Sequence, residues 1–115
     1  SQTVVEGLCT PRAYHQLKCY ESAVLWARTE GYIPAPETSH AIACAIDEAV
    51  RAREEGKEKV ILFNWSGHGL MDLAGYQKYF EGQLTDYSLP QADIEKFLRE
   101  LNGLPQAPAN KTGKW

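Results

Sequence analysis

The chain has 115 residues, of which 43% are hydrophobic and 23% are charged, and its formal net charge is −3. This length and composition are typical of one soluble globular domain with a modest core. The small negative charge argues against a nucleic-acid or anionic-membrane partner, and no apolar run approaches the roughly 18 residues of a membrane span.

The chain contains three cysteines, Cys9, Cys19 and Cys44, with no C-x-x-C pair. An odd number argues against a disulfide framework, and Cys19 and Cys44 lie in apolar helical stretches where reduced thiols are commonly buried. Residues 1–6 lack the basic and apolar regions of a secretion signal. We therefore expect a cytoplasmic protein with free thiols.

The first predicted helix follows an irregular start. Residues 1–14 show no helical period, although residues 12–14 could form a short strand. A helix is predicted over residues 16–29, with Gly31 as its C-terminal stop. Its core-facing positions are expected to be Leu17, Tyr20, Ala23, Val24, Leu25 and Ala27.

A second helix is predicted over residues 40–55. Thr38 or Ser39 can cap its start, and Gly56 ends it. Its small residues allow close packing against a neighbouring element. The positions expected to face inward are Ile42, Ala45, Ile46, Ala49 and Val50.

Residues 59–64 predict a strand, because Val60 to Phe63 are four consecutive apolar residues. They show no polar alternation, which favours a strand covered on both faces, as in a parallel sheet. Ser66-Gly67-His68-Gly69 follows at the carboxyl end, where ligands of open α/β sheets bind. Glycines let the backbone approach a bound group, and a following helix start favours negative charge. Residues 66–69 are therefore a candidate binding turn.

Two further helices are predicted, over residues 73–81 with Asp72 as cap and over residues 91–102 with Pro90 at the first position. Residues 105–115 are rich in Pro, Asn, Gly and Lys, so we expect disorder there. The inward positions are expected to be Leu73, Tyr76, Tyr79 and Phe80 in the first of these helices, and Ile94, Phe97, Leu98 and Leu101 in the second.

The strand predicted at residues 59–64 lacks partner strands within the chain. Its backbone N–H and C=O groups need partners, and each parallel neighbour would require its own strand and crossover. Only residues 12–14 offer another strand within the chain. We therefore predict that a partner chain, or a larger fold of which this chain is a piece, completes the sheet.

Isolated polar residues give few chemical signals. Ser66 is not in a G-x-S-x-G motif, and His68 is too close in sequence for the usual base geometry. The spacing of His15, His40 and His68 fits no short metal motif. No lysine has the desolvated or cationic surroundings that a Schiff-base lysine needs. Glu30 is a mild functional hint, because an acidic residue at a helix C-terminus opposes the dipole.

Two blocks carry a resemblance to a known family. Residues 28–41, Arg-Thr-Glu-Gly-Tyr-Ile-Pro-Ala-Pro-Glu-Thr-Ser-His-Ala, and residues 60–69, Val-Ile-Leu-Phe-Asn-Trp-Ser-Gly-His-Gly, resemble the C-terminal part of the tryptophan synthase beta chain. Pro36 and His68 resemble the second, beta-like class, and residues 70–72 depart from the charged residues of the first class. The resemblance runs from about Cys9 to Leu101, and complete members are several times longer.

The resemblance implies a pyridoxal-phosphate enzyme of fold type II, which joins L-serine and indole into L-tryptophan by β-replacement. It implies that the Ser66 hydroxyl meets the pyridine nitrogen of the cofactor and that Glu30 lies near the ring. It also implies that Gly67 and Gly69 keep the turn close to the ring and that His68 lies beside it. The family's catalytic lysine and phosphate-binding glycine loop lie upstream, so they are absent here.

We therefore expect an α/β chain, the C-terminal portion of a fold type II enzyme, with mostly helices around one buried strand of a larger sheet. Residues 1–104 would form this segment and 105–115 a tail. The missing N-terminal part or a partner chain would complete it, the whole enzyme would be a homodimer, and the chain alone would be inactive. The alternatives are a free-standing, non-catalytic interaction module and another fold type II lyase.

Overall fold

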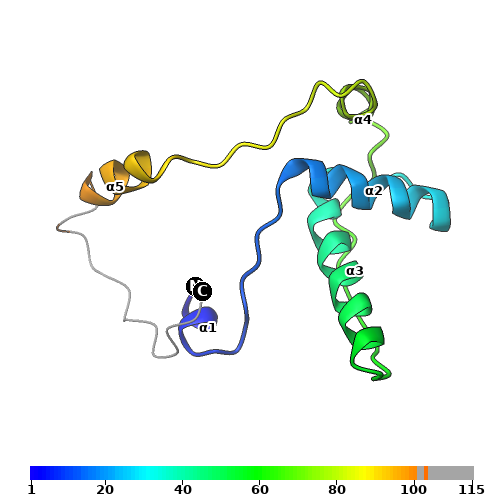
Figure 1. Ribbon diagram of the computed structural model, residues 1–115, viewed down its shortest axis with the longest axis horizontal. Helices are drawn as coiled ribbons and strands as arrows, with labels where there is room; N and C mark the ends of the chain where they lie inside the picture. Colours follow the sequence, from blue (N-terminus) through cyan, green and yellow to red (C-terminus); the bar gives the residue numbers. More distant parts are fainter. Residues whose placement is uncertain (101–102, 104–115) are drawn as a thin grey trace. The chain divides into compact units, whose positions relative to one another are not determined.

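The computed structural model describes residues 1–100 and Gly103. Its contacts divide the chain into two units, which are described separately: residues 13–86, and residues 1–12 together with the chain from residue 87 onward. The predicted tail at 105–115 and the predicted helical positions Leu101 and Asn102 lie outside the described residues. In Figure 1 the first unit contains α2, α3 and α4, and the second contains α1 and α5.

Helix α2 spans Gln16–Glu30 and lies across α3, which spans Thr38–Glu54 (Figure 1). Gly31 ends α2 in a left-handed conformation with φ 79°, and its N–H bonds the Ala27 carbonyl, as the sequence predicted. The buried face agrees with the predicted one only in part, at Ala23. Cys19, Ser22 and Ala23 are the buried residues of α2, whereas Leu25 is 49% exposed.

Helix α3 begins earlier than predicted, and the predicted cap is wrong. Glu37 holds the cap position with helical backbone angles and no capping hydrogen bond, so Thr38 and Ser39 lie within the helix. Both are buried, and their hydroxyls bond elsewhere: Thr38 to the 66–67 turn and Ser39 to the Ala35 carbonyl. Ala43 is fully buried, as expected of a small residue on α3, and so is Ile42. The prediction that Ala49 and Val50 face inward is wrong, since both are exposed.

Residues 57–67 form neither helix nor strand and run back along α3 (Figure 1). Lys59 Nζ lies 3.9 Å from Glu48 Oε2, and Ser66 Oγ lies 2.8 Å from Thr38 Oγ1, so the segment is antiparallel to the helix. The predicted sheet is not formed within the described residues. Val60 and Leu62 are 99% and 93% exposed, so only one face of this apolar run is covered here.

Helix α4 spans Leu73–Phe80 and contacts α2. Asp72 takes the predicted cap position, without a side-chain capping bond. Tyr76 is buried, and Tyr20 of α2 packs edge-on against it with ring centroids 5.1 Å apart. The prediction that Leu73 and Phe80 face inward is wrong, since they are 50% and 63% exposed.

The second unit contains α1, Gln2–Val5, and α5, Gln91–Glu100. The helical turn of α1 replaces the predicted irregular start, and residues 12–14 form no strand. Neither helix buries a residue, and Phe97 and Leu98 of the predicted α5 stripe are about half exposed. No helix in the described part of the chain is both long and apolar enough to cross a bilayer.

Candidate functional site

Backbone hydrogen bonds join the predicted binding turn to the segment before α3. The Ala35 N–H donates to the Gly67 carbonyl at 3.0 Å, and the Gly69 N–H donates to the Ile33 carbonyl at 2.7 Å. Pro34 and His68 form an antiparallel bridge between these bonds. The structure thus brings together two segments that lie more than 30 residues apart, and both come from the blocks singled out in the sequence.

The two glycines of the turn have different environments. A Cβ at Gly69 would lie 2.3 Å from the Pro34 carbonyl oxygen and 3.0 Å from Ile33 Cγ2, so only glycine permits this approach. A Cβ at Gly67 would meet only Ala35 Cβ, at an ordinary 3.6 Å. The packing of this chain therefore requires Gly69 but does not require a glycine at position 67.

The Ser66 hydroxyl is held by Thr38, which is 1% exposed. Thr38 Oγ1 lies 2.8 Å from Ser66 Oγ, accepts the Gly67 N–H at 3.0 Å, and lies 3.0 Å from the Gly67 carbonyl oxygen. Ser66 itself is exposed. A buried hydroxyl on a helix thus orients an exposed hydroxyl on the turn.

The remaining predicted site residues flank this turn. His68 is exposed, and its Nδ1 accepts a 3.3 Å hydrogen bond from the Leu70 N–H. Glu30 is the last residue of α2 and is exposed, and its side chain makes no hydrogen bond or ion pair within the described ranges. It lies three residues before Ile33, whose carbonyl binds the turn. The structure therefore joins Ser66, Gly67 and His68 directly and leaves Glu30 connected only through the backbone.

Four aromatic side chains pack beside the site. Trp26 of α2 contacts Phe63 edge-on at 5.2 Å between ring centroids and Trp65 at 5.7 Å. Trp65 also contacts Tyr32 at 6.2 Å. These rings fix residues 63–65, and hence the approach to Ser66, against the end of α2. The buried Nε1 of Trp26 finds no hydrogen-bond partner in the part of the chain that the structure describes.

Tyr76 supports the other side of the turn. Its hydroxyl donates to the Pro34 carbonyl, the same oxygen that excludes a side chain at Gly69. The pKa of Tyr76 is raised to about 12, chiefly by burial; the nearby Tyr20 and Asp72 contribute to this rise, and a hydrogen bond to Ser39 opposes it. The phenol therefore stays protonated and keeps its hydrogen to donate.

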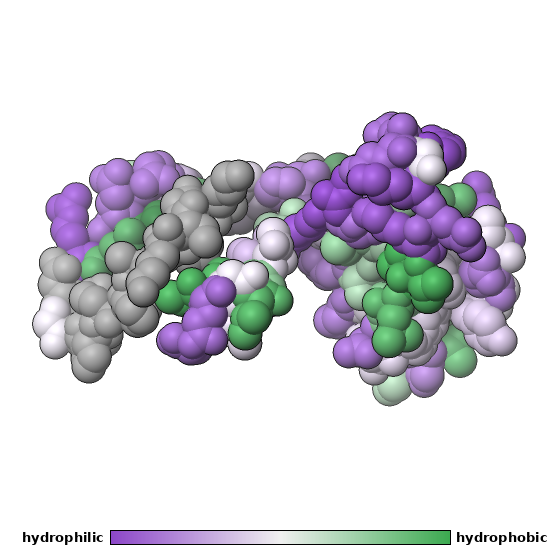
Figure 2. All heavy atoms as spheres, turned by 90° about the horizontal axis from the view of Figure 1, so that it is seen from below, coloured by the Kyte–Doolittle hydropathy of each residue, from purple (hydrophilic) through white to green (hydrophobic). Residues whose placement is uncertain are grey.

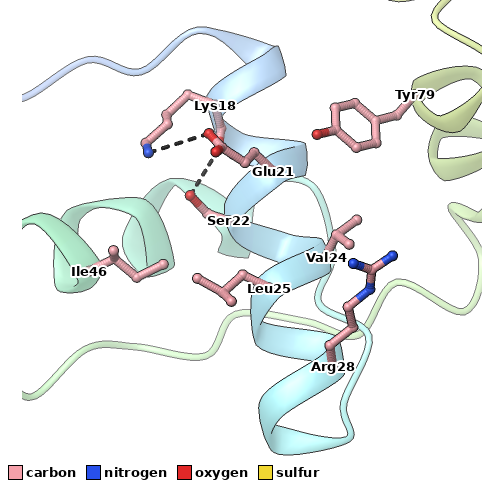
Figure 3. A pocket seen from close by; sticks show the side chains of 8 residues that line it. All are labelled: Lys18, Glu21, Ser22, Val24, Leu25, Arg28, Ile46 and Tyr79. Atoms are coloured by element: carbon pink, nitrogen blue, oxygen red, sulfur yellow. Dashed lines mark hydrogen bonds and ion pairs between the residues drawn. The ribbon is translucent and has the colours of Figure 1, made fainter.

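A separate hollow of about 310 Å³ lies between α2, α3 and α4 (Figure 3). Lys18 and Glu21 pair with each other on one side of it at 3.4 Å, and the Ser22 hydroxyl is bonded to the Lys18 carbonyl. Its lining includes none of the turn residues. Lys18, Glu21 and Ser22 already have partners within the chain, and the hollow is distinct from the turn.

Comparison with known proteins gives a consistent result. The chain is 58% identical over 81 residues to the tryptophan synthase beta chain of Thermococcus onnurineus, covering 70% of this chain and 18% of the relative. It is 56% identical over 87 residues to tryptophan synthase beta chain 2 of Pyrococcus furiosus (76% and 20%) and 56% identical over 98 residues to the tryptophan synthase beta chain of Pyrococcus horikoshii (85% and 21%). No family model matches the chain.

The chain resembles a portion of the tryptophan synthase beta chain. It spans about a fifth of the length of the curated relatives that it matches. Relatives named beta chain 2 are among them, in agreement with the second class indicated by the sequence. Residues 28–41 and 60–69, which carried the tryptophan synthase beta resemblance, are the two segments that the structure pairs at the turn.

Sequence reasoning missed Thr38 as a member of this site. It was read only as a helix cap, because Ser and Thr are favoured at that position. Two signals could have found it: its place inside the block similar to tryptophan synthase beta, and the adjacent Ser39, which offered a second cap. Only one of the hydroxyls of Thr38 and Ser39 is needed for a cap, so the other is available for a tertiary contact.

Proposed function

We propose that this chain is the C-terminal portion of a pyridoxal-phosphate-dependent enzyme of the tryptophan synthase beta type, which makes L-tryptophan from L-serine and indole by β-replacement. The observation that carries the proposal is the Ser66 hydroxyl, exposed on a turn that is braced by Thr38 and by backbone bonds. The 53–58% identity to several tryptophan synthase beta chains supports the same assignment.

The groups at the turn fit the pyridine end of pyridoxal phosphate. Ser66 and Thr38 are neutral hydroxyls, and a hydroxyl can either donate to or accept from a heterocyclic nitrogen. Gly67 presents no side chain, and the packing of the chain does not require a glycine there. We attribute this glycine to the approach of a flat ring, which a side chain at position 67 would hinder.

The bound cofactor would supply an electron sink for breaking and making bonds at the substrate amino acid. Ser66 would donate its hydrogen to the ring nitrogen, and as a neutral group it would not force that nitrogen to stay protonated. Gly67 would allow the ring to lie against the turn. His68 and Glu30 would flank the ring, with His68 held by the Leu70 N–H.

The catalytic lysine and the phosphate-binding loop are assigned to a remainder outside this chain. The lysines of the described residues, namely Lys18, Lys57, Lys59, Lys78 and Lys96, are all exposed. An exposed ammonium lacks the desolvation that activates a Schiff-base lysine. The chain alone is therefore proposed to be inactive, and the complete enzyme is proposed to be a cytoplasmic homodimer.

The exposed apolar surface favours a piece of a larger protein over a free-standing interaction module. Figure 2 shows hydrophobic side chains reaching the surface of the unit of residues 13–86, and Val60 and Leu62 are almost wholly exposed. The backbone of residues 59–64 makes no backbone hydrogen bond within the described segments. Unpaired backbone beside exposed apolar side chains is what a strand leaves when its neighbours are removed.

The proposal is tested with a chimera, in which this chain replaces the 87 matched residues of the Pyrococcus furiosus relative. The chimera should bind pyridoxal phosphate and form tryptophan, whereas the chain alone should give no borohydride-fixed cofactor. A chimera that binds no cofactor, or a lone chain that fixes it, would contradict the proposal.

Ser66→Asp tests the site within that chimera. A carboxylate holds the ring nitrogen protonated, so the variant should keep the cofactor but change the ratio of tryptophan to pyruvate formed from serine. Ser88→Asp, an exposed serine outside the unit that holds the site, adds the same charge and serves as the control. If Ser66→Asp and the control give identical spectra and product ratios, the assignment of Ser66 to the ring nitrogen is wrong.

A further inference from the structure

Thr38 Oγ1 is a buried hydroxyl surrounded by three partners. It accepts the Gly67 N–H at 3.0 Å and lies within hydrogen-bond distance of both Ser66 Oγ and the Gly67 carbonyl oxygen. A hydroxyl carries one hydrogen to donate and two lone pairs to accept. Thr38 therefore cannot donate to both oxygens at once, and two proton arrangements share the same heavy-atom positions.

In the first arrangement Thr38 donates to Ser66 Oγ, and the Ser66 hydrogen is free to point away from the protein as a donor. In the second arrangement Thr38 donates to the Gly67 carbonyl, and Ser66 donates to Thr38. Ser66 then presents only lone pairs and acts as an acceptor. Switching between them turns two hydroxyls and moves no backbone.

Neither arrangement leaves a buried backbone group without a partner. The Gly67 carbonyl also accepts the Ala35 N–H at 3.0 Å, so it stays bonded when Thr38 turns away. The Gly67 N–H donates to Thr38 in both arrangements. Because an unsatisfied buried polar group is costly, this second bond from Ala35 keeps the two arrangements close in free energy.

We propose that Thr38 is a positioning residue that lets the Ser66 hydroxyl switch between donor and acceptor toward the pyridine nitrogen of the cofactor. The inference rests on the proposed function. An unprotonated nitrogen selects the first arrangement, and a protonated nitrogen selects the second. The site thus accommodates a change in the protonation of the ring without a charged partner.

The experiment uses the chimera without bound cofactor and measures its affinity for two probes. These are pyridoxal phosphate and its analogue with carbon in place of the ring nitrogen. Thr38→Val removes the hydroxyl at similar volume. It should weaken pyridoxal phosphate about tenfold, the effect of one lost hydrogen bond, and change the analogue by less than about twofold. Thr38→Ser should restore the behaviour of the unmutated chimera.

Ser39→Ala is the matched control, because Ser39 is equally buried beside Thr38 and bonds the Ala35 carbonyl rather than Ser66. It should affect both probes alike. If Thr38→Val fails to fold, Thr38→Cys replaces it, since a thiol is a weak donor and acceptor. Equal losses for both probes, or no loss, would overturn the proposal.

Ser66→Ala separates this inference from the function on which it rests. If Ser66→Ala removes the preference for pyridoxal phosphate over the analogue and Thr38→Val does not, only the role of Thr38 fails. If Ser66→Ala leaves that preference unchanged, the assignment of Ser66 to the ring nitrogen fails. A chimera that binds neither probe contradicts the proposed function itself.

Discussion

Gly69→Ala should disrupt the turn through a purely steric effect. The added Cβ would lie 2.3 Å from the Pro34 carbonyl oxygen, well inside the 3.0 Å that real Cβ atoms keep. That oxygen belongs to backbone and is also bonded by the Tyr76 hydroxyl, so it cannot rotate away. Gly69 has no positive φ, so the strain comes from contact alone.

The magnitude follows from what must move. Overpacking of this kind costs about 1–3 kcal/mol. Separating the segments also weakens the Gly69–Ile33 and Ala35–Gly67 bonds, each worth about 1 kcal/mol. We expect a loss of about 3 kcal/mol in the free energy of unfolding. The matched variant Gly67→Ala meets only Ala35 Cβ at 3.6 Å and should change stability by about 0.5 kcal/mol or less.

Urea unfolding followed by tryptophan emission measures both variants. Trp26 and Trp65 report on this unit, and Trp115 is replaced by Phe in every sample to remove its signal. With a slope of about 1–3 kcal/mol per molar urea, the Gly69→Ala midpoint should fall by about 1–3 M. An unchanged midpoint, or an equal fall for Gly67→Ala, would refute the steric reading of the turn.

Two further variants test the support of the turn and the open apolar face. The pKa of Tyr76 is raised to about 12, against an ordinary 10, so on raising the pH this phenol ionises first in the unfolded chain. The free energy of unfolding should therefore be largest below pH 10 and fall by about 2–3 kcal/mol towards pH 12. Tyr76→Phe should remove most of this fall in urea midpoints, and an undiminished pH dependence would count against it. Leu62→Lys should change the stability of the isolated chain by no more than about 0.5 kcal/mol, because Leu62 is 93% exposed. The same substitution should lower the urea midpoint of the chimera, where that face is proposed to be covered. Equal effects in both proteins would contradict the covering.

The helices could be predicted where local chemistry decides them. Gly31 ends α2 because only glycine adopts its left-handed angles without cost, and that requirement is visible in the sequence. Asp72 takes the predicted cap position of α4, although its side chain makes no capping bond. The burial of Ile42 also followed from helical spacing. These features depend on residues within a few positions of one another.

The site could be predicted only in part, because its decisive contacts are distant in sequence. Ser66 and His68 were predicted from the turn. Nothing local shows that the Thr38 hydroxyl, 28 residues away, bonds Ser66 instead of capping α3. The clash that fixes Gly69 likewise depends on the Pro34 carbonyl. The role proposed for Ser66 comes from the resemblance to a known family, and no spacing argument could give it.

The segment at residues 59–64 carries the features that favour the proposed larger sheet. Ile61 and Phe63 are partly covered, and Phe63 packs against Trp26, while Val60 and Leu62 face solvent. A strand designed to lie at a solvated surface would carry polar residues at positions 60 and 62. Apolar residues there are favourable only if a second layer covers them, at about 25 cal/mol for each Å² removed from water. The backbone of the same residues makes no backbone hydrogen bond within the described residues, so its edges are open to neighbouring strands. The proposed larger sheet would meet both conditions together, and the turn that follows would then stand at the carboxyl end of a central strand, where a cofactor site of an open α/β fold is built.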